Sequence, residues 1–241
     1  MAYLKIAEGC DKRCSYCIIP KIRGRFRSVP MQELLNEAKR LASEGVKELV
    51  LVAQETTLYG KDLTGEKQLP LLLHELCKIE GIEWIRLLYC YPEEITDELI
   101  KVIKTEEKVC NYIDMPIQHS ENRILQRMGR RTSREDLVAV IKKLRKEIPD
   151  ITIRTTLITG FPGESQEDHE GLMNFVEECQ FDRLGVFTYS PEEDTLAATF
   201  EDQIDEEVKE ERRDELMSLQ QEISYEHTQQ LVGKTIKVMV E

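Results

Sequence analysis

The sequence predicts an α/β fold, a partial (β/α)6 barrel in which six parallel strands are covered by helices on the outside. Short apolar segments of strand type alternate six times with segments of helical periodicity along the 241 residues. In addition, a polar or Pro/Gly-rich cluster follows each predicted strand. Because all six strands contribute residues to the same face, a TIM-like barrel around one site is favoured over an open, doubly wound sheet.

The predicted strands are short and rich in β-branched, leucine or aromatic residues. The run ELVLVA is apolar almost throughout, as expected for a parallel strand that is buried on both faces. In chain order the six strands are residues 3–9, 48–53, 83–89, 111–116, 151–158 and 183–189.

Helical periodicity fills the intervals between these strands. Pro70 suits the first turn of its helix, Thr96 is predicted as an N-cap, and Gly45 and Gly81 follow helix ends. A final, highly charged helix is predicted for about residues 205–231. The other helices are predicted around residues 31–42, 69–79, 95–105, 137–148 and 172–179.

Composition and charge exclude several classes of protein. No apolar run approaches the ~20 residues of a membrane span, and the first residues lack a signal peptide, so a cytoplasmic protein is expected. The net charge of −13 weighs against direct nucleic-acid binding by this chain. Locally, residues 192–226 carry a charge of −11, whereas residues 121–146 carry +6 and residues 1–31 carry +5.

Three of the seven cysteines form a cluster with the spacing C-x3-C-x2-C: Cys10, Cys14 and Cys17. A structural zinc site needs four ligands, and no fourth cysteine or histidine lies nearby in the sequence. Three thiolates on a four-iron cluster would leave one iron open for chemistry. A cluster is therefore favoured, with zinc or metal-free redox thiols as alternatives. The scattered Cys77, Cys90, Cys110 and Cys179 are expected to be inert core residues.

With Tyr16 as the aromatic residue, the motif C-x3-C-x-aromatic-C resembles the signature of radical S-adenosylmethionine enzymes. The segments LVAQETTLYGKDL, EWIRLLYCYPEEITDEL, YIDMPIQH, RMGRRTSREDL, RTTLITGFPGES and FDRLGVFTYSPEEDT extend the resemblance to the methylthiotransferase branch. This resemblance implies that the three clustered cysteines hold a [4Fe-4S] cluster whose open iron is chelated by S-adenosylmethionine.

The resemblance also implies which other residues lie at the cofactor. Radical hydrogen abstraction needs no general base, so no catalytic acid or base is expected, although His119 is another candidate for the substrate side. In SPEEDT, Asp194 stands where the branch usually has glycine, and Asp tolerates left-handed backbone better than most residues. The expected cofactor-binding residues are Tyr16, Gln54, Thr56, Asp114, Gln118 and Gly160.

The resemblance implies a substrate, partners and a domain organisation. The substrate would be an aspartate of small-subunit ribosomal protein twelve, and the electron donor a flavodoxin or ferredoxin. The alternatives are a methylthiotransferase for a tRNA adenosine and a non-catalytic iron–sulfur or zinc module that docks on the ribosome. Residues 1–231 are expected to form the core domain and residues 232–241 to begin a TRAM-like β-barrel domain. An N-terminal domain with a second [4Fe-4S] cluster is expected to be absent, as in an excised central domain.

Overall fold

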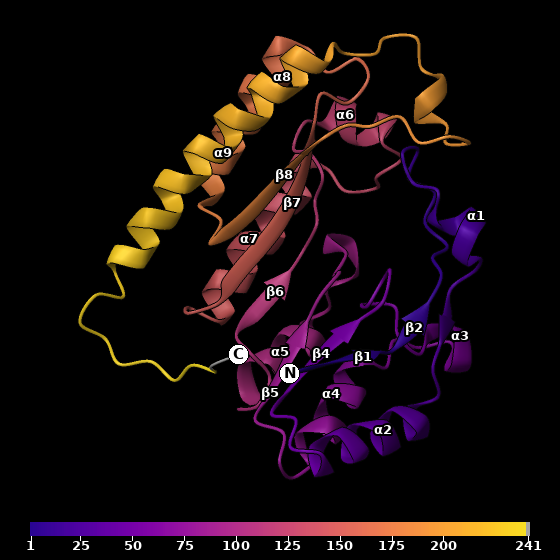
Figure 1. Cartoon of the computed structure of the whole chain (residues 1–241), viewed down its shortest axis with the longest axis vertical. Coiled ribbons are helices and arrows are strands. Elements are labelled where there is room, and N and C mark those ends of the chain that lie inside the picture. The colour runs from indigo at the N-terminus through magenta and orange to yellow at the C-terminus, as the bar shows by residue number, and fades with distance from the viewer. Residues whose placement is uncertain (240–241) are drawn as a thin grey trace.

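The computed structural model describes residues 1–239, and its strands form two parallel, three-stranded halves of one curved layer (Figure 1). The first half has the order β1-β4-β5, and the second has the order β6-β7-β8. All six predicted strands are observed, so the partial-barrel prediction is confirmed. Their bounds are β1 (Ala2–Lys5), β4 (Glu48–Val52), β5 (Trp84–Leu87), β6 (Tyr112–Asp114), β7 (Thr152–Thr159) and β8 (Arg183–Thr188).

The two halves are joined between β5 and β6 by single hydrogen bonds rather than by a continuous ladder. The Ile85 N–H donates to the Lys108 carbonyl oxygen at 2.7 Å, and the Cys110 N–H donates to the Ile85 carbonyl at 2.9 Å. Further along, the Cys90 N–H donates to the Asp114 carbonyl at 2.8 Å. The carboxyl ends of strands from both halves therefore face the same side of the molecule.

The predicted helices lie on the outside of the strand layer (Figure 1). Thr96 caps its helix as expected, because its hydroxyl oxygen accepts a hydrogen bond from the Leu99 N–H at 3.2 Å. Ser133 and Ser165 form capping boxes at the starts of two others. These outer helices are α2 (Met31–Ser43), α4 (Leu69–Cys77), α5 (Asp97–Thr105), α7 (Arg134–Glu147), α8 (Gln166–Cys179) and α9 (Glu206–Gln229).

Apart from β2, which lies within the predicted strand 3–9, the sequence did not predict the short elements that shape the loops at the strand ends. Each is too brief to show a hydrophobic period. A two-stranded antiparallel hairpin forms within the first of these loops. The short elements are β2 (Ala7–Glu8), α1 (Ile19–Arg23), β3 (Arg27–Ser28), α3 (Lys61–Thr64), η1 (Pro92–Glu94), α6 (Asn122–Arg127) and η2 (Ala197–Thr199).

Helix α9 is part of the fold although most of its surface is charged. It packs along α8 and β8 (Figure 1) and buries Leu216 and Ile223. Its Gln220 side chain donates to the Phe181 carbonyl oxygen at 2.7 Å. Residues 232–239 form a turn and an unpaired segment, and the last two residues lie outside the described part. The expected start of a β-barrel domain therefore stays a prediction.

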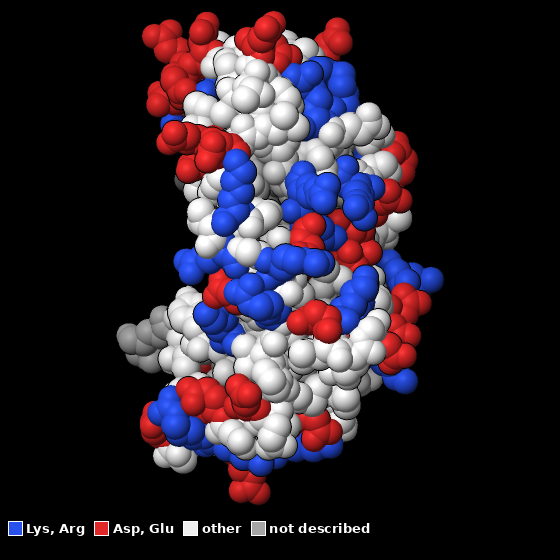
Figure 2. Space-filling view, turned by 90° about the vertical axis from the view of Figure 1, so that its right-hand side faces the viewer, with Lys and Arg blue, Asp and Glu red and all other residues white. Residues whose placement is uncertain are grey.

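Charge is unevenly distributed on the surface. Figure 2 views the molecule from the side of α1, where Lys and Arg side chains gather across the middle and acidic side chains gather at the end where α9 begins. The exposed bases around the cysteine loop are Arg13, Lys21, Arg23, Arg25 and Arg27. Among residues 1–239, no helix combines the length and apolar character needed to span a membrane.

The scattered cysteines only partly match the expectation. Cys90 and Cys179 are buried, as predicted. Cys77 and Cys110 are only half-buried. Cys77 still packs against the main core, whereas the prediction of a core position was wrong for Cys110. Cys77 is the last residue of α4, and Cys110 precedes β6, where the apolar layer gives way to polar surface.

Candidate metal centre

The cysteine loop follows β2 and is held in place by backbone contacts. The Cys10 N–H donates to the Gly24 carbonyl oxygen at 3.2 Å, and the Cys17 N–H donates to the Cys14 carbonyl at 3.1 Å. From the other side, the Ser15 N–H donates to the Met128 carbonyl at 2.9 Å. The loop is thus braced by α1 on one side and by the end of α6 on the other.

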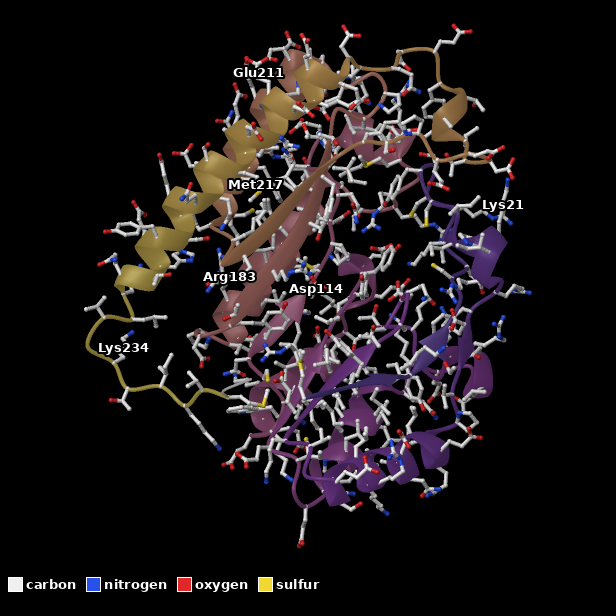
Figure 3. All side chains as sticks on the ribbon, viewed as in Figure 1. Lys21, Asp114, Arg183, Glu211, Met217 and Lys234 are labelled. Carbon is white, nitrogen blue, oxygen red and sulfur yellow. The ribbon has the colours of Figure 1, made fainter. Side chains whose placement is uncertain are left out.

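All three clustered cysteines line one cavity of about 500 Å³. Strands from both halves contribute to its wall, as the barrel prediction requires. In Figure 3, Asp114 lies between the two halves, whereas Lys21 lies on the outer edge of α1. The volume of the cavity is within the usual range for small-molecule sites. The predicted residues that line it are Cys10, Cys14, Tyr16, Cys17, Gln54, Asp114 and Gln118.

Two predicted cofactor residues are not brought to this cavity. The Thr56 hydroxyl donates to the Leu88 carbonyl oxygen at 2.5 Å, and its N–H donates to the Tyr89 carbonyl at 3.1 Å. These bonds hold the loop after β5. A Cβ on Gly160 would clash with the Cγ of Lys209, so this glycine accommodates helix α9. Both residues support the fold around the site.

Gln54 and Asp114 position other parts of the wall. The Gln54 side-chain oxygen accepts a hydrogen bond from the Gly9 N–H at 2.8 Å, which ties the end of β4 to the cysteine loop. The buried Asp114 carboxylate accepts from Arg154 at 2.6 Å and from the Tyr89 N–H at 3.0 Å. Asp114 therefore already has two partners, and it orients Arg154 and Tyr89 in the cavity wall.

Sequence reasoning missed several residues of the cavity wall. Tyr91 lies in the polar segment after the predicted strand 83–89, and its hydroxyl lies 3.9 Å from the Cys14 sulfur. Arg154 and Thr156 alternate along β7 with the buried Ile153, Thr155 and Leu157. That alternation was a signal for which side chains face the barrel interior. The other missed residues are Lys5, Ile19, Val52, Ala53, Tyr89, Pro116 and Phe187.

Burial affects the acidity of the clustered thiols. Burial raises the pKa of Cys10 to about 11, and it also raises the pKa of Cys17. The thiols must lose their protons to bind a metal, and soft, cationic metals bound to the thiolates would offset the free-energy cost of that deprotonation.

A charged network lies beside the cysteine loop. Lys12 is 2.8 Å from a Glu94 oxygen and 3.1 Å from a Glu93 oxygen, which ties the loop to the turn after β5. Burial raises the pKa of Glu55 to about 7. One Glu55 oxygen lies 3.9 Å from Lys12 and has no hydrogen-bond partner among the described residues.

Three of the six arginines of residues 121–146 have acidic partners. Because these pairs consume exposed positive charge, the segment does not offer a continuous surface for phosphate groups. Arg130 differs, since it is buried. The ion pairs are Arg123 with Asp168, Arg127 with Asp202, and Arg134 with Glu121.

Parallel strands with a three-cysteine loop and a cavity at their carboxyl ends define a class of enzyme that binds a metal group and a small cofactor. The profile of the Radical SAM superfamily matches residues 4–176. The chain therefore belongs to the radical SAM superfamily.

Curated relatives show which branch of the superfamily the chain resembles. The chain is 64% identical over 240 residues to "Ribosomal protein uS12 methylthiotransferase RimO" of Lachnoclostridium phytofermentans, and 59% identical to the protein of that name from Clostridium perfringens. Both alignments cover 100% of this chain but 54% of the relative. The chain thus spans about half the length of these relatives, and the predicted resemblance to methylthiotransferases is confirmed.

Solved structures show the same fold at low sequence identity. Coproporphyrinogen III oxidase (HemN) from Escherichia coli superposes with a TM-score of 0.65 at 20% identity, covering 94% of this chain and 52% of that one. The methyltransferase TsrM from Kitasatospora setae, with cobalamin and a [4Fe-4S] cluster bound, also gives 0.65 at 18% identity, covering 79% and 38%. These likenesses support the partial-barrel architecture.

Proposed function

We propose that this chain is the core of a methylthiotransferase that cleaves S-adenosylmethionine reductively and acts on an aspartate of ribosomal protein uS12. The observation that carries the proposal is the convergence of Cys10, Cys14 and Cys17 on one cavity with Gln54 and Gln118. The high identity to proteins named for uS12 methylthiolation supports the substrate. In this proposal residues 1–231 act as the core domain.

Cys10, Cys14 and Cys17 would hold a [4Fe-4S] cluster through their sulfur atoms. When bound, this cluster would supply the electron that cleaves S-adenosylmethionine chelated at the open iron. Tyr16 packs edge-on against Phe161, with ring centroids 6.4 Å apart, and would form an apolar wall for the adenine. Gln54 and Gln118 would orient polar groups of the cofactor, while Asp114 keeps Arg154 in place.

Charge supports the two proposed protein partners. An acidic electron donor such as flavodoxin or ferredoxin would dock on the basic face around the cysteine loop (Figure 2), because complementary charge steers association. On this face Arg13 and Arg27 form no ion pair within residues 1–239, whereas Lys21, Arg23 and Arg25 do. The acidic segment 192–226 would favour a basic ribosomal protein over RNA. The ion pairs made by Arg123, Arg127 and Arg134 likewise weigh against the tRNA alternative. In this proposal the protein acts in the cytoplasm.

The test is anaerobic reconstitution of the chain with iron and sulfide, followed by dithionite and S-adenosylmethionine. Iron per chain is measured, and 5′-deoxyadenosine is quantified by chromatography. We expect about four irons per chain and formation of deoxyadenosine. The Cys14→Ala variant should lose both. Cys110→Ala removes a half-buried thiol that does not line this cavity, and it should behave like the parent.

Other outcomes would contradict the proposal. Binding of zinc without iron would support the metal-module alternative. Equal deoxyadenosine production by the Cys14→Ala variant would show that cleavage does not depend on this loop. The chain spans about half the length of its relatives. This experiment therefore tests only the reductive cleavage of S-adenosylmethionine.

A further inference from the structure

Arg130 is a buried cation without an acidic partner. Arg130 is only 6% exposed. Its guanidinium forms no ion pair with a carboxylate among residues 1–239. One guanidinium nitrogen donates to the Pro116 carbonyl oxygen at 3.1 Å. The other two nitrogens, Nε and Nη1, are buried without a hydrogen-bond partner in the described part of the chain. The remaining arginines of this segment that pair with acids are all more exposed.

Such an arrangement costs free energy in the absence of a nearby anion. An unpaired charge removed from water carries an effective penalty of several kcal/mol. Buried polar groups without partners are rare and call for an explanation such as an ion or a functional role. Arginine cannot avoid the penalty by losing its proton. Within residues 1–239, Glu93 is the one carboxylate that influences Arg130, and it makes no ion pair with it, so the position suits a site at which further negative charge is bound.

The surroundings of Arg130 place it next to the cysteine loop. A Cβ on the preceding Gly129 would lie 2.7 Å from the Arg13 carbonyl oxygen, so residues 129 and 13 are in close backbone contact. The guanidinium lies 4.3 Å from the centroid of the Tyr91 ring. The hydroxyl of that ring is the group 3.9 Å from the Cys14 sulfur. Burial lowers the pKa of Arg130, but neighbouring groups on Tyr16, Tyr91, Cys14 and Glu93 raise it above its ordinary value.

A four-iron cluster on three thiolates would provide the missing negative charge. Three thiolates outweigh the two positive charges of an oxidised four-iron core, so the assembly is formally an anion, and reduction adds a second negative charge. A fixed cation nearby favours the more negative, reduced state, since charge and hydrogen bonds near a cluster tune its potential. Low exposure strengthens this interaction by reducing solvent screening.

We propose that Arg130, seated on the ring of Tyr91, is the counter-charge of the metal cluster on Cys14 and stabilises its reduced state. This inference rests on the proposed function, because it requires a cluster on the three cysteines. Arg130 acts as a positioning residue, since it is not among the residues that line the cavity. It would raise the fraction of the reduced cluster without contacting S-adenosylmethionine.

The test compares the reduction potential of the reconstituted cluster in three variants of the full chain. Arg130→Gln removes the charge but keeps a donor for the Pro116 carbonyl, whereas Arg130→Lys keeps the charge. Arg131→Gln is the matched control, because Arg131 is the neighbouring arginine and is exposed. Potentials are measured by anaerobic redox titration followed by electron paramagnetic resonance, alongside iron per chain. Circular dichroism checks the fold of each variant.

We expect Arg130→Gln to shift the reduction equilibrium at least tenfold toward the oxidised cluster, which is about 59 mV for one electron. Arg130→Lys should recover most of this shift, and Arg131→Gln should match the parent. An unchanged potential in folded Arg130→Gln would overturn the inference while leaving the proposed function intact. Failure of the parent chain to take up iron would instead overturn the proposed function.

Loss of the cluster in Arg130→Gln is also informative. If Arg130→Lys then retains a cluster with the potential of the parent, positive charge is the required property and the inference is supported. If Arg130→Lys also loses the cluster, the guanidinium shape rather than its charge is required, and the inference is wrong.

Discussion

At Gly9 the backbone leaves the hairpin strand β2 and enters the cysteine loop with φ of 81°. A Cβ at this position would clash with the Arg25 carbonyl oxygen and would lie 2.6 Å from that of Gly24. The contact is with backbone, which cannot move aside without displacing the hairpin. Glycine is therefore required both by its dihedral angle and by the close approach of another chain segment.

Replacing Gly9 with alanine should destabilise the protein by more than the left-handed dihedral alone would cost, which is about 1 kcal/mol. The control is Gly65→Ala, because Gly65 has φ of 86° but no atom within 4 Å of the place that an alanine methyl group would occupy. Chemical denaturation gives the free energy of unfolding for each variant. Equal losses at the two positions would show that the approach of Arg25 does not constrain the loop.

Residues other than glycine also adopt left-handed backbone at the cavity. Tyr89 has φ of 58° and Gln118 has φ of 75°, and both side chains line the cavity. Such conformations cost on the order of 1–3 kcal/mol each and gather at functional sites. Asp194 has φ of 67°, which agrees with the expectation that aspartate could replace glycine in that turn. At Tyr89 and Gln118, backbone strain accompanies side chains that are directed into the site.

At the scale of elements, Glu164 connects the turn after β7 to helix α9. The buried carboxylate accepts a hydrogen bond from Arg212 of α9 at 2.9 Å and from the Phe161 N–H at 3.3 Å. His119 Nε2 lies 3.5 Å from Oε2 of Glu164, the oxygen that accepts from Phe161. Burial would raise the pKa of Glu164, but His119 and Arg212 hold it below its usual value. These contacts brace the turn after β7 against α9.

The lowered pKa of Glu164 predicts a specific pH dependence of stability. The unfolded carboxyl titrates near about 4.3, so the ionised group stabilises the fold above that pH and loses its effect as pH falls through the lower folded pKa. Glu164→Gln should lower the melting temperature at pH 7, with a smaller difference from the parent below about pH 4. Thermal unfolding across pH checks this.

The matched control for this experiment is Glu210→Gln, because Glu210 is exposed on α9. It should change the melting temperature little at any pH, as most surface substitutions do. A Glu164→Gln variant whose loss of stability is independent of pH would indicate a packing role without linkage to protons.

At the scale of the whole molecule, α9 closes the outer surface of the second half. Leu216 is fully buried in the main core, whereas the adjacent Met217 is 40% exposed (Figure 3). The sparse apolar stripe of this charged helix is therefore sufficient to make it part of the core. Because most helical stability in proteins comes from tertiary packing, we attribute the order of α9 mainly to its packing on β8 and α8.

Leu216→Ala should destabilise the chain by about 2–5 kcal/mol, as expected for a cavity in a packed core. Met217→Ala should cost much less, since the side chain is partly in solvent. Urea unfolding monitored by circular dichroism gives both values. A small effect of Leu216→Ala would mean that α9 unfolds separately and is an appendage of the barrel.

Sequence reasoning recovered the strands and long helices because their apolar periods are local properties. It also found Thr96 as a cap and the three clustered cysteines from their spacing, whereas Tyr16, Gln54, Asp114 and Gln118 were implied by the resemblance to radical S-adenosylmethionine enzymes. It placed Thr56 and Gly160 at the cofactor although their partners are Leu88 and Lys209, which are remote in sequence. It missed Tyr91 because the sequence of a loop does not reveal which way a side chain points.

The sequence by itself determined the alternation of strands and helices, the three-cysteine loop and the superfamily, because each depends on the spacing of residues that are close together in the chain. Only the tertiary structure decided which arginines pair with acids and which one is buried beside Cys14. It also decided which strand-end residues face the cavity and which hold the fold. Pairing, burial and close approach depend on residues far apart in the chain, so they exist only once the two halves of the barrel and α9 have packed together.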